Sequence, residues 1–292
     1  MFCGLPKVAD GSQKRYNAPL MPVLSIIIPA YNEEAAVAPV IQALRQLSLD
    51  AEIIVVDDGS TDRTAEVAEH QGARVVRHAM NMGYGASLKD GIRIAASDII
   101  VITDADGTYP ADAIPSLFAT FRRGFDMVVG ARQGAAYRGA LLKMPARVVF
   151  TWIVEFVTGR TIPDINSGLR IFRKGDVLPY LNDLCNGFSF TTTITLVYQL
   201  TGKMVTYVPI SYHTRIGQSK VRMVRDTLRT LQYITEAVVR FNPIKAFLLF
   251  ALVPFFIGVA SEPWAGIFGL LFGALAACVV FAMGLVVYGL KR

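Results

Sequence analysis

The C-terminal part of the chain limits most strongly how this sequence can fold. Residues 246 to 290 contain one charged residue, Glu262, although 18% of all 292 residues are charged. The runs on either side, 244–260 and 264–290, are long enough to cross a membrane as helices, the first near the lower limit. Pro254 inside the first run is tolerated in a membrane helix. We therefore expect a two-helix transmembrane hairpin over 244–292; the alternative is a buried helical pair in a soluble core.

Basic residues lie at both ends of this hairpin. They are Lys220, Arg222, Arg225, Arg229, Arg240 and Lys245 before it, and Lys291 and Arg292 after it. By the positive-inside rule, the preceding domain and both termini are expected in the cytoplasm. Each cation near an anionic leaflet adds roughly 1 kcal/mol of attraction, so the net charge of +6 favours a membrane partner and no nucleic acid. The cysteines Cys3, Cys185 and Cys278 show no pairing or metal spacing, as suits a reducing compartment.

Ahead of the hairpin, short apolar runs alternate with segments of helical periodicity. The expected strands are 23–28, 52–56, 73–77, 98–103 and 126–130, and the expected helices are 34–47, 62–71, 85–96 and 110–122. This alternation predicts an α/β domain over 23–220 with a mostly parallel sheet and helices on both faces. In such sheets ligands bind at the carboxyl ends of the strands. Residues 1–22 lack the apolar core of a signal peptide and are expected to be a flexible leader.

Two further segments have an apolar face and a basic face. Residues 139–160 combine bulky apolar residues with Lys143, Arg147 and Arg160. Residues 221–243 place an apolar stripe opposite several arginines, directly before the hairpin. A basic amphipathic helix that leads into a membrane span is typical of an element lying in the interface. We expect interfacial helices here, the alternative being helices that only face the domain core.

Polar motifs follow the first two expected strands. In "DDGSTD", Gly59 to Asp62 fit a turn and a helix cap, but a cap does not account for Asp57 and Asp58 together. One of these carboxylates is a reasonable acceptor for a nucleobase N–H. In "PAYNEE", Tyr31 and Glu33 could contact a base or ribose, or simply cap the next helix.

The fourth strand ends in "TDADG", which places Asp104 and Asp106 one residue apart. Two carboxylates at this spacing repel each other unless a cation lies between them. Their hard oxygen ligands suit Mg²⁺ or Mn²⁺, ions that usually share their coordination with substrate phosphates. A divalent ion in this position would stabilise charge on a departing diphosphate. The alternative is a solvated acidic turn.

Taken together, the motifs resemble those of a known family. The chain is similar to family 2 glycosyltransferases with the GT-A fold, and in particular to the polyprenyl-phosphate sugar transferases. The matching pieces are "IIIPAYNEE", "IIVVDDGSTD", "NMGYGASLKDGI", "DADGTYP", "VVGAR", "DINSGLRIFRK" and "TRIGQSK", which span roughly residues 23 to 220. The resemblance implies transfer of a hexose, with inversion, from a uridine or guanosine diphosphate sugar to undecaprenyl or dolichyl phosphate. It also implies a homo-oligomer formed through membrane-proximal helices.

The resemblance implies roles for individual residues. The nucleotide pocket would contain Pro29, Tyr31, Glu33, Asp57, Asp58 and Asp104. Asp104 and Asp106 would hold the metal, with Thr108 where some relatives have a glutamine ligand. The acceptor phosphate is largely dianionic at neutral pH and needs cations more than a base. The candidates by motif position are Arg132, Arg170, Arg215 and Lys220, with Arg132 and Arg170 also counted as catalytic. Asp164 could contact sugar hydroxyls.

Two other functions remain open from the sequence. A polysaccharide-extending membrane synthase would share the fold, but such enzymes usually carry a Gln-x-x-Arg-Trp helix, and neither Trp152 nor Trp264 follows that pattern. A non-catalytic membrane-tethered scaffold would also share the fold. The presence of Asp104, Asp106, Arg132 and Arg170 argues against the scaffold.

Overall fold

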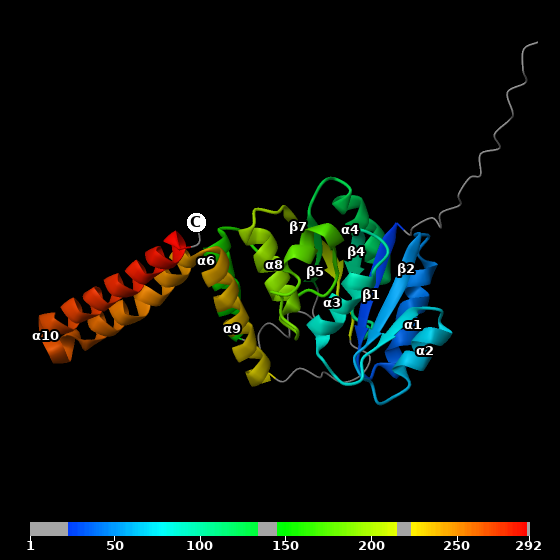
Figure 1. Cartoon of the computed structure of the whole chain (residues 1–292), viewed down its shortest axis with the longest axis horizontal. Helices are drawn as coiled ribbons and strands as arrows, with labels where there is room; N and C mark the ends of the chain where they lie inside the picture. The colour runs from blue at the N-terminus through cyan, green and yellow to red at the C-terminus, as the bar shows by residue number, and fades with distance from the viewer. Residues whose placement is uncertain (1–22, 134–144, 215–222, 291–292) are drawn as a thin grey trace, which may run out of the picture.

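A seven-stranded sheet forms the centre of the domain in the computed structural model, which describes residues 23–133, 145–214 and 223–290 (Figure 1). The strand order is β3-β2-β1-β4-β6-β5-β7. All neighbouring pairs are parallel except those of β6 with β4 and with β5. The strands are β1 (Leu24–Ala30), β2 (Ala51–Asp57), β3 (Arg74–Arg77), β4 (Ile99–Ile102), β5 (Met127–Gln133), β6 (Arg170–Arg173) and β7 (Val205–Ser211).

Helices cover both faces of this sheet, because the central strands are apolar on both sides. In β1, Ile26 and Ile28 pack in a cluster with α1, α2 and α4, whereas Ile27 packs in a second cluster with α3 and α8. The helices are α1 (Glu34–Gln46), α2 (Thr64–His70), α3 (Tyr84–Ile94), α4 (Ile114–Phe121), α7 (Lys174–Val177) and α8 (Phe190–Leu200). Short 3₁₀ turns lie at Ala111–Ala113 and Leu178–Tyr180. The predicted α/β architecture is confirmed.

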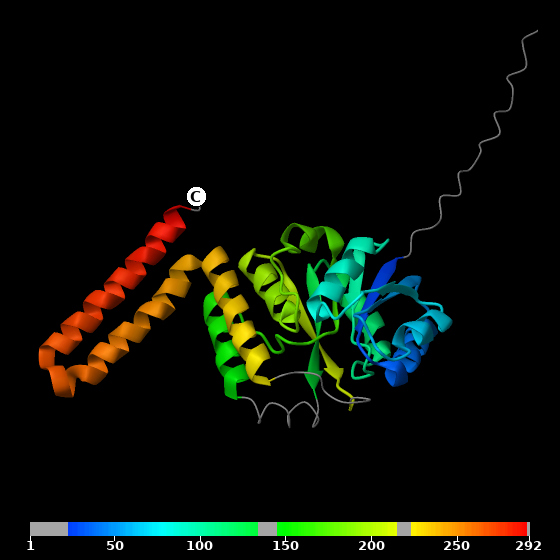
Figure 2. The same cartoon turned by 60° about the horizontal axis from the view of Figure 1, so that its bottom comes forward.

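A third layer joins this domain to the C-terminal hairpin. It contains α6 (Pro145–Thr158) and α9 (Met223–Phe241), which lie between the domain and the hairpin (Figures 1 and 2). Val154 of α6, Leu196 of α8 and Ile234 of α9 share one buried cluster with Ala246 of the hairpin. Lys245 Nζ donates to the Phe156 and Val157 carbonyls at the end of α6, at 3.1 and 3.0 Å. The hairpin is therefore anchored to the domain by packing and by these hydrogen bonds.

The hairpin is α10 (Pro243–Gly289), which reverses direction at Gly266, where φ is 55° and ψ is −148°. Its two arms, Pro243–Ser261 and Gly266–Gly289, have mean hydropathies of 2.1 and 2.7. They pack closely where Gly258 meets Gly273, since a Cβ on Gly258 would lie 2.7 Å from the Gly273 Cα. Only 17% and 11% of the most apolar windows are buried. This exposure argues against the buried pair of a soluble core and fits two membrane-spanning helices.

Several elements differ from the sequence-based expectation. The segment 110–122, expected as one helix, is a 3₁₀ turn followed by the shorter α4. Strands β6 and β7 and helix α8 were not predicted. The expected amphipathic helix over 139–160 is described from Pro145 onward, and that over 221–243 from Met223 to Phe241. The leader at 1–22 and the chain end at 291–292 lie outside the described residues.

Candidate active site

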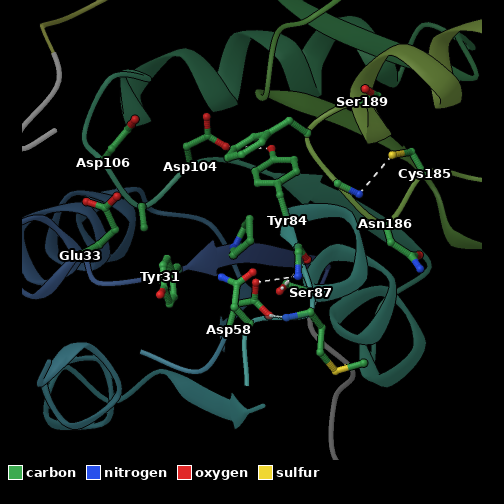
Figure 3. Close-up of a pocket in the computed structure, with 18 of the residues that line it drawn as sticks. Tyr31, Glu33, Asp58, Tyr84, Ser87, Asp104, Asp106, Cys185, Asn186 and Ser189 are labelled. Atoms are coloured by element: carbon green, nitrogen blue, oxygen red, sulfur yellow. Dashed lines mark hydrogen bonds between the residues drawn. The ribbon is translucent and has the colours of Figure 1, made fainter. Parts of the chain in front are cut away.

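A cleft of about 900 Å³ opens at the carboxyl ends of β1, β2 and β4 (Figure 3). Six residues expected at the site from the sequence line it: Pro29, Tyr31, Glu33, Asp58, Asp104 and Asp106. The remaining walls come from residues 81–87 at the start of α3, from residues 185–189 before α8, and from Gln232 and Tyr233 of α9. The cleft thus lies between the strand ends and the helix that leads into the hairpin.

The loops after β1 and β2 interlock on one side of the cleft. Asn32, which has a positive φ of 50°, accepts a hydrogen bond at Oδ1 from the Thr61 amide at 2.8 Å. In return, the Asn32 amide donates to Ser60 Oγ at 2.9 Å, and the Glu33 amide donates to Thr64 Oγ1 at 2.8 Å. These reciprocal bonds fix the backbone that carries Tyr31 and Glu33. The Asn32 side chain therefore clamps the two loops together.

Asp58 is buried at the base of the cleft and holds the turn that begins α3. Its carboxylate accepts from the Met82 and Gly83 amides, each at 2.8 Å, and contacts His78 Nδ1 at 2.8 Å. The other His78 nitrogen lies 3.2 Å from Asp90 Oδ2. Asp57 is also buried but does not line the cleft, and within the described chain its Oδ1 has no hydrogen-bond partner. Of the two adjacent acids, only Asp58 faces the cleft.

Asp104 and Asp106 extend from the end of β4, and their carboxylates lie on the same side of the cleft as Glu33 (Figure 3). Asp106 Oδ1 accepts from the Thr108 amide at 3.1 Å and from the Thr108 hydroxyl at 2.7 Å. Thr108 therefore orients Asp106. Asp104 lies against Gly168, where a Cβ would come within 2.9 Å of both carboxylate oxygens. Only glycine at 168 leaves room for this carboxylate.

The Asp104–Asp106 pair has the right chemistry for Mg²⁺ or Mn²⁺, because both side chains supply hard oxygen donors. Among the residues that the structure describes, no group of three His, Cys, Asp or Glu side chains could hold a metal by itself. A protein site with two carboxylates is typical of an ion that completes its coordination with water and substrate phosphates. The residues present therefore fit a divalent ion shared with a phosphorylated ligand.

Tyr84, in the first turn of α3, supports Asp104 from below. Its hydroxyl donates to Asp104 Oδ1 at 2.8 Å (Figure 3). Burial, reinforced by the charge of Asp104, raises the pKa of Tyr84 well above its ordinary value, so the hydroxyl stays protonated and acts as a donor. The Tyr84 ring stacks on Phe188, with centroids 5.6 Å apart and planes at 21°.

The wall at residues 185–189 is fixed to α3 by a buried lysine. Lys89 Nζ donates to the Leu184 carbonyl at 2.5 Å and to Asn186 Oδ1 at 2.6 Å. Burial lowers the pKa of Lys89, and these oxygen partners compensate part of the cost of burying the ammonium. At Gly85, a Cβ would lie 2.1 Å from the Cys185 carbonyl oxygen. This wall was not predicted from the sequence. The signal in "NMGYGASLKDGI" is the pair of glycines at the start of α3, Gly83 and Gly85, together with Lys89 in the middle of the helix.

Arg132 and Asp164 form a buried ion pair beside the cleft. Arg132 Nε and Nη2 donate to the two Asp164 oxygens at 2.7 and 2.8 Å, and the Arg132 amide adds a third bond at 3.2 Å. The guanidinium also lies over the Tyr212 ring, 5.3 Å from its centroid. Neither Arg132 nor Asp164 belongs to the lining of the cleft. Asp164 is thus held by Arg132, and its predicted contact with sugar hydroxyls stays a prediction.

Arg170 is placed differently from the sequence-based expectation. Its side chain is fully buried, and its nitrogens donate to the Ser167 and Ile165 carbonyls at 2.8 and 2.7 Å and to Thr195 Oγ1 at 2.6 Å. Burial lowers the pKa of Arg170. A guanidinium enclosed in this way does not fit direct binding of an acceptor phosphate. It holds the 165–168 segment, which includes the Gly168 that contacts Asp104.

The other two cations expected to bind the acceptor phosphate, Arg215 and Lys220, lie outside the described residues. They belong to the segment between β7 and α9, the helix whose Gln232 and Tyr233 line the cleft. Their predicted roles stay predictions.

Comparison with known proteins agrees with this geometry. Residues 25–189 match the family described as glycosyl transferase family 2. A dolichyl-phosphate hexose transferase of Haloferax volcanii is 28% identical over 201 residues, which cover 68% of this chain and 86% of that protein. An undecaprenyl-phosphate 4-deoxy-4-formamido-L-arabinose transferase of Salmonella choleraesuis is 28% identical over 219 residues, 71% of this chain but only 65% of that protein.

Solved structures share the fold at lower identity. One of them is glucosyl-3-phosphoglycerate synthase from Mycobacterium tuberculosis in complex with Mn²⁺, uridine diphosphate and glucosyl-3-phosphoglycerate. It superposes with a TM-score of 0.58 and 22% sequence identity, and the match covers 75% of this chain and 80% of that one. The same synthase with Mg²⁺ and uridine diphosphate has a TM-score of 0.61 and 21% identity, covering 74% and 79% of the two chains.

Proposed function

The chain belongs to glycosyl transferase family 2, and on this basis we propose that it transfers a hexose from a nucleotide sugar to a polyprenyl phosphate at the membrane surface. The observation that carries the proposal is the composition of the cleft. Its lining contains both the paired carboxylates Asp104 and Asp106 and two residues, Gln232 and Tyr233, of α9, the helix that leads into the apolar hairpin. A donor diphosphate and a membrane-borne acceptor can therefore meet in one place.

The donor nucleotide is assigned to the side of the cleft near Pro29, Tyr31, Glu33 and Asp58. Asp57 is buried next to Asp58 and does not line the cleft, so any effect of its charge on the nucleotide is indirect. Asp104 and Asp106 would hold Mg²⁺ or Mn²⁺ against the diphosphate, where the ion would offset negative charge on the leaving group. Tyr84 and Thr108 keep the two carboxylates in place through their hydrogen bonds. The solved relatives bound to uridine diphosphate with Mn²⁺ or Mg²⁺ support the choice of ligand class.

The transfer itself is a single displacement at the anomeric carbon. An oxygen of the lipid phosphate forms a bond to that carbon, and the bond to the donor diphosphate breaks, so the nucleoside diphosphate leaves with the electron pair. A phosphate monoester has a second pKa of about 6 and is largely dianionic at pH 7, so no protein base is required. The acceptor phosphate needs cations instead. We assign Arg215 and Lys220 to this role by motif position, with Arg170 as a positioning residue behind Gly168. Arg132 is the third candidate by motif position, and it would bind the phosphate only by exchanging its ion pair with Asp164.

The membrane arrangement follows from the hairpin and its flanks. The two arms of α10 would cross the bilayer, and α6 and α9 would lie at its surface, with the catalytic domain and both termini in the cytoplasm. Trp152 and Phe156 of α6 are exposed and stacked, with centroids 5.9 Å apart, as suits rings at a membrane interface. The relatives that act on dolichyl or undecaprenyl phosphate support the acceptor class.

The proposal is tested by incubating the purified full-length protein with labelled uridine and guanosine diphosphate sugars, Mn²⁺ or Mg²⁺ and short polyprenyl phosphates. A glycolipid product is expected from at least one donor, and none after metal chelation.

Asp106→Ala should abolish product formation without affecting folding or membrane insertion. The matched control is Asp112→Ala, because Asp112 is exposed on the next turn outside the cleft. Full activity of Asp106→Ala, or no product from any donor, contradicts the proposal.

A further inference from the structure

Phe188 exposes a large apolar ring inside an otherwise polar part of the cleft. Its side chain is 48% exposed and lines the cleft together with Asn186, Gly187 and Ser189. One face of the ring stacks on Tyr84. Binding pockets for small molecules characteristically combine an apolar surface with a few fixed polar groups. The 186–189 wall has this combination, and the function proposed above gives it no role.

The position of this wall relative to Asp104 identifies the part of the ligand that it faces. The Phe188 ring is 5.6 Å from the Tyr84 ring, and the Tyr84 hydroxyl is 2.8 Å from Asp104 Oδ1. If Asp104 holds the donor diphosphate, that diphosphate is bonded to the nucleoside at one end and to the sugar at the other. The nucleoside is assigned above to the side of the cleft near Tyr31 and Asp58, so the wall beyond Tyr84 is left for the sugar. A hexose has an apolar C–H face and a rim of hydroxyls, which suits a flat ring beside amide and hydroxyl groups. An isoprenoid chain would instead need a continuous apolar wall, whereas the lining residues near Phe188 in the chain include the polar Asn186 and Ser189.

The wall is held in position before any ligand binds. Lys89 fixes Leu184 and Asn186, and the Asn186 carbonyl accepts from the Ala86 amide at 3.0 Å. The Gly187 amide donates to Cys185 Sγ at 3.1 Å. Because the wall is already ordered, little conformational entropy is lost when a ligand binds. Its fixed groups can therefore distinguish one sugar from another.

We propose that residues 186–189 form the subsite for the transferred sugar, with the exposed face of the Phe188 ring as the surface on which the sugar packs. This inference rests on the proposed function and extends it by naming the residues that recognise the hexose. Phe188 is a specificity-determining residue in this assignment, and Tyr84 positions it.

The test separates sugar binding from nucleotide binding. Affinities of the full-length protein are measured by calorimetry with Mn²⁺ for uridine and guanosine diphosphate, each alone and as the glucose or mannose conjugate. Phe188→Ala should leave the affinity for the free nucleotide within about twofold and weaken binding of the conjugate about tenfold. The KM for the donor should rise to a similar extent, whereas the KM for polyprenyl phosphate should not change. Phe188→Tyr, which keeps the ring, should restore donor binding.

Two further variants keep the result interpretable. Phe188→Leu preserves apolar bulk without a flat face and should fall between the wild type and Phe188→Ala. Leu178→Ala is the control, because Leu178 is an exposed apolar residue of the 3₁₀ turn Leu178–Tyr180 and does not line the cleft. The inference is overturned if Phe188→Ala and Phe188→Leu bind the conjugates as the wild type does, or if only the KM for polyprenyl phosphate changes. Failure of the wild type to bind any nucleotide would instead overturn the proposed function, and the sugar subsite with it.

Discussion

At the scale of single residues, the two central carboxylates are each held by a neighbouring hydroxyl. Asp104 accepts from Tyr84 and Asp106 accepts from Thr108, at 2.8 and 2.7 Å. Hydrogen bonds of this kind orient metal-binding carboxylates and are a substantial part of a metal site's affinity. Thr108 stands where the resemblance implies a glutamine in some relatives, and its amide and hydroxyl orient the Asp106 carboxylate. The position therefore contributes to the site through Asp106.

Tyr84→Phe should weaken metal binding, because it removes the hydrogen bond to Asp104 and retains the ring that stacks on Phe188. Loss of such a bond typically lowers metal affinity by about 10- to 100-fold. We expect a shift of this size in the Mn²⁺ affinity measured by electron paramagnetic resonance in the presence of uridine diphosphate. Activity should recover partly at high Mn²⁺. Tyr180→Phe is the control, since Tyr180 packs against Phe241 and lies outside the cleft. Equal Mn²⁺ affinities for wild type and Tyr84→Phe would show that the hydroxyl does not position Asp104.

At the scale of elements, the start of α3 connects three parts of the cleft. Asp58 holds the Met82 and Gly83 amides, Tyr84 holds Asp104, and Lys89 holds the 184–186 backbone. The close packing of Gly85 against Cys185 completes the arrangement. One helix start therefore determines how Asp58, Asp104 and the 185–189 wall are spaced around the cleft.

Gly85→Ala should disrupt this arrangement, because the new Cβ would lie 2.1 Å from the Cys185 carbonyl oxygen and 2.9 Å from the Asn186 carbonyl carbon. Backbone atoms cannot yield as a flexible side chain can, so the 185–189 wall must move. We expect the KM for the donor to rise at least tenfold and the thermal midpoint to fall by several degrees. Gly175→Ala is the matched control, since its Cβ would meet only the Asp98 side chain at 3.6 Å. Wild-type kinetics in Gly85→Ala would contradict the close packing between α3 and this wall.

The elements also show what the sequence could and could not predict. Strands β1, β2, β4 and β5 were predictable because each contains a continuous apolar run that is buried on both faces. Strand β3 was predicted from Val75 and Val76, although both are only partly buried and the arginines on either side are exposed. Strand β6 has four residues, two of them arginines, and β7 has a proline, so neither has that pattern. Helix α8 contains four threonines, which are poor helix formers, yet all but its last residue are buried. Tertiary packing overrides local propensity in these elements.

The same distinction applies to the site. Carboxylates that directly follow predictable strands, Asp58, Asp104 and Asp106, do line the cleft. Arg132, Asp164 and Arg170 were assigned by motif alone, and their burial and pairing depend on contacts distant in sequence, such as that of Arg132 with Asp164. The 185–189 wall depends on Lys89, which is almost a hundred residues away. Such long-range partners cannot be read from local pattern.

At the scale of the whole molecule, the cleft and the hairpin are mechanically connected through α9. The cleft-facing residues of this helix, Gln232 and Tyr233, are followed directly by Ile234, which is buried in the cluster shared with α6, α8 and the hairpin. An acceptor that stays in the bilayer would approach the cleft along this helix. Under the proposed function, the hairpin would therefore also set the distance between the donor site and the lipid surface.

The hairpin topology can be tested directly, because the hairpin starts and ends on the domain side and reverses direction at its far end, at Gly266 (Figure 1). Cys3 and Cys278 are replaced by alanine, and Cys185 is retained because it is buried. Single cysteines are then introduced by Ser261→Cys at the far end of the hairpin and by Thr214→Cys on the catalytic domain. An impermeant maleimide should label Ser261→Cys in intact cells and Thr214→Cys only in inside-out vesicles, because the basic residues that flank the hairpin predict a cytoplasmic domain. Labelling of both positions from the same side would show that the hairpin lies in one leaflet, and the cleft would then have to reach its lipid acceptor without a membrane-spanning anchor.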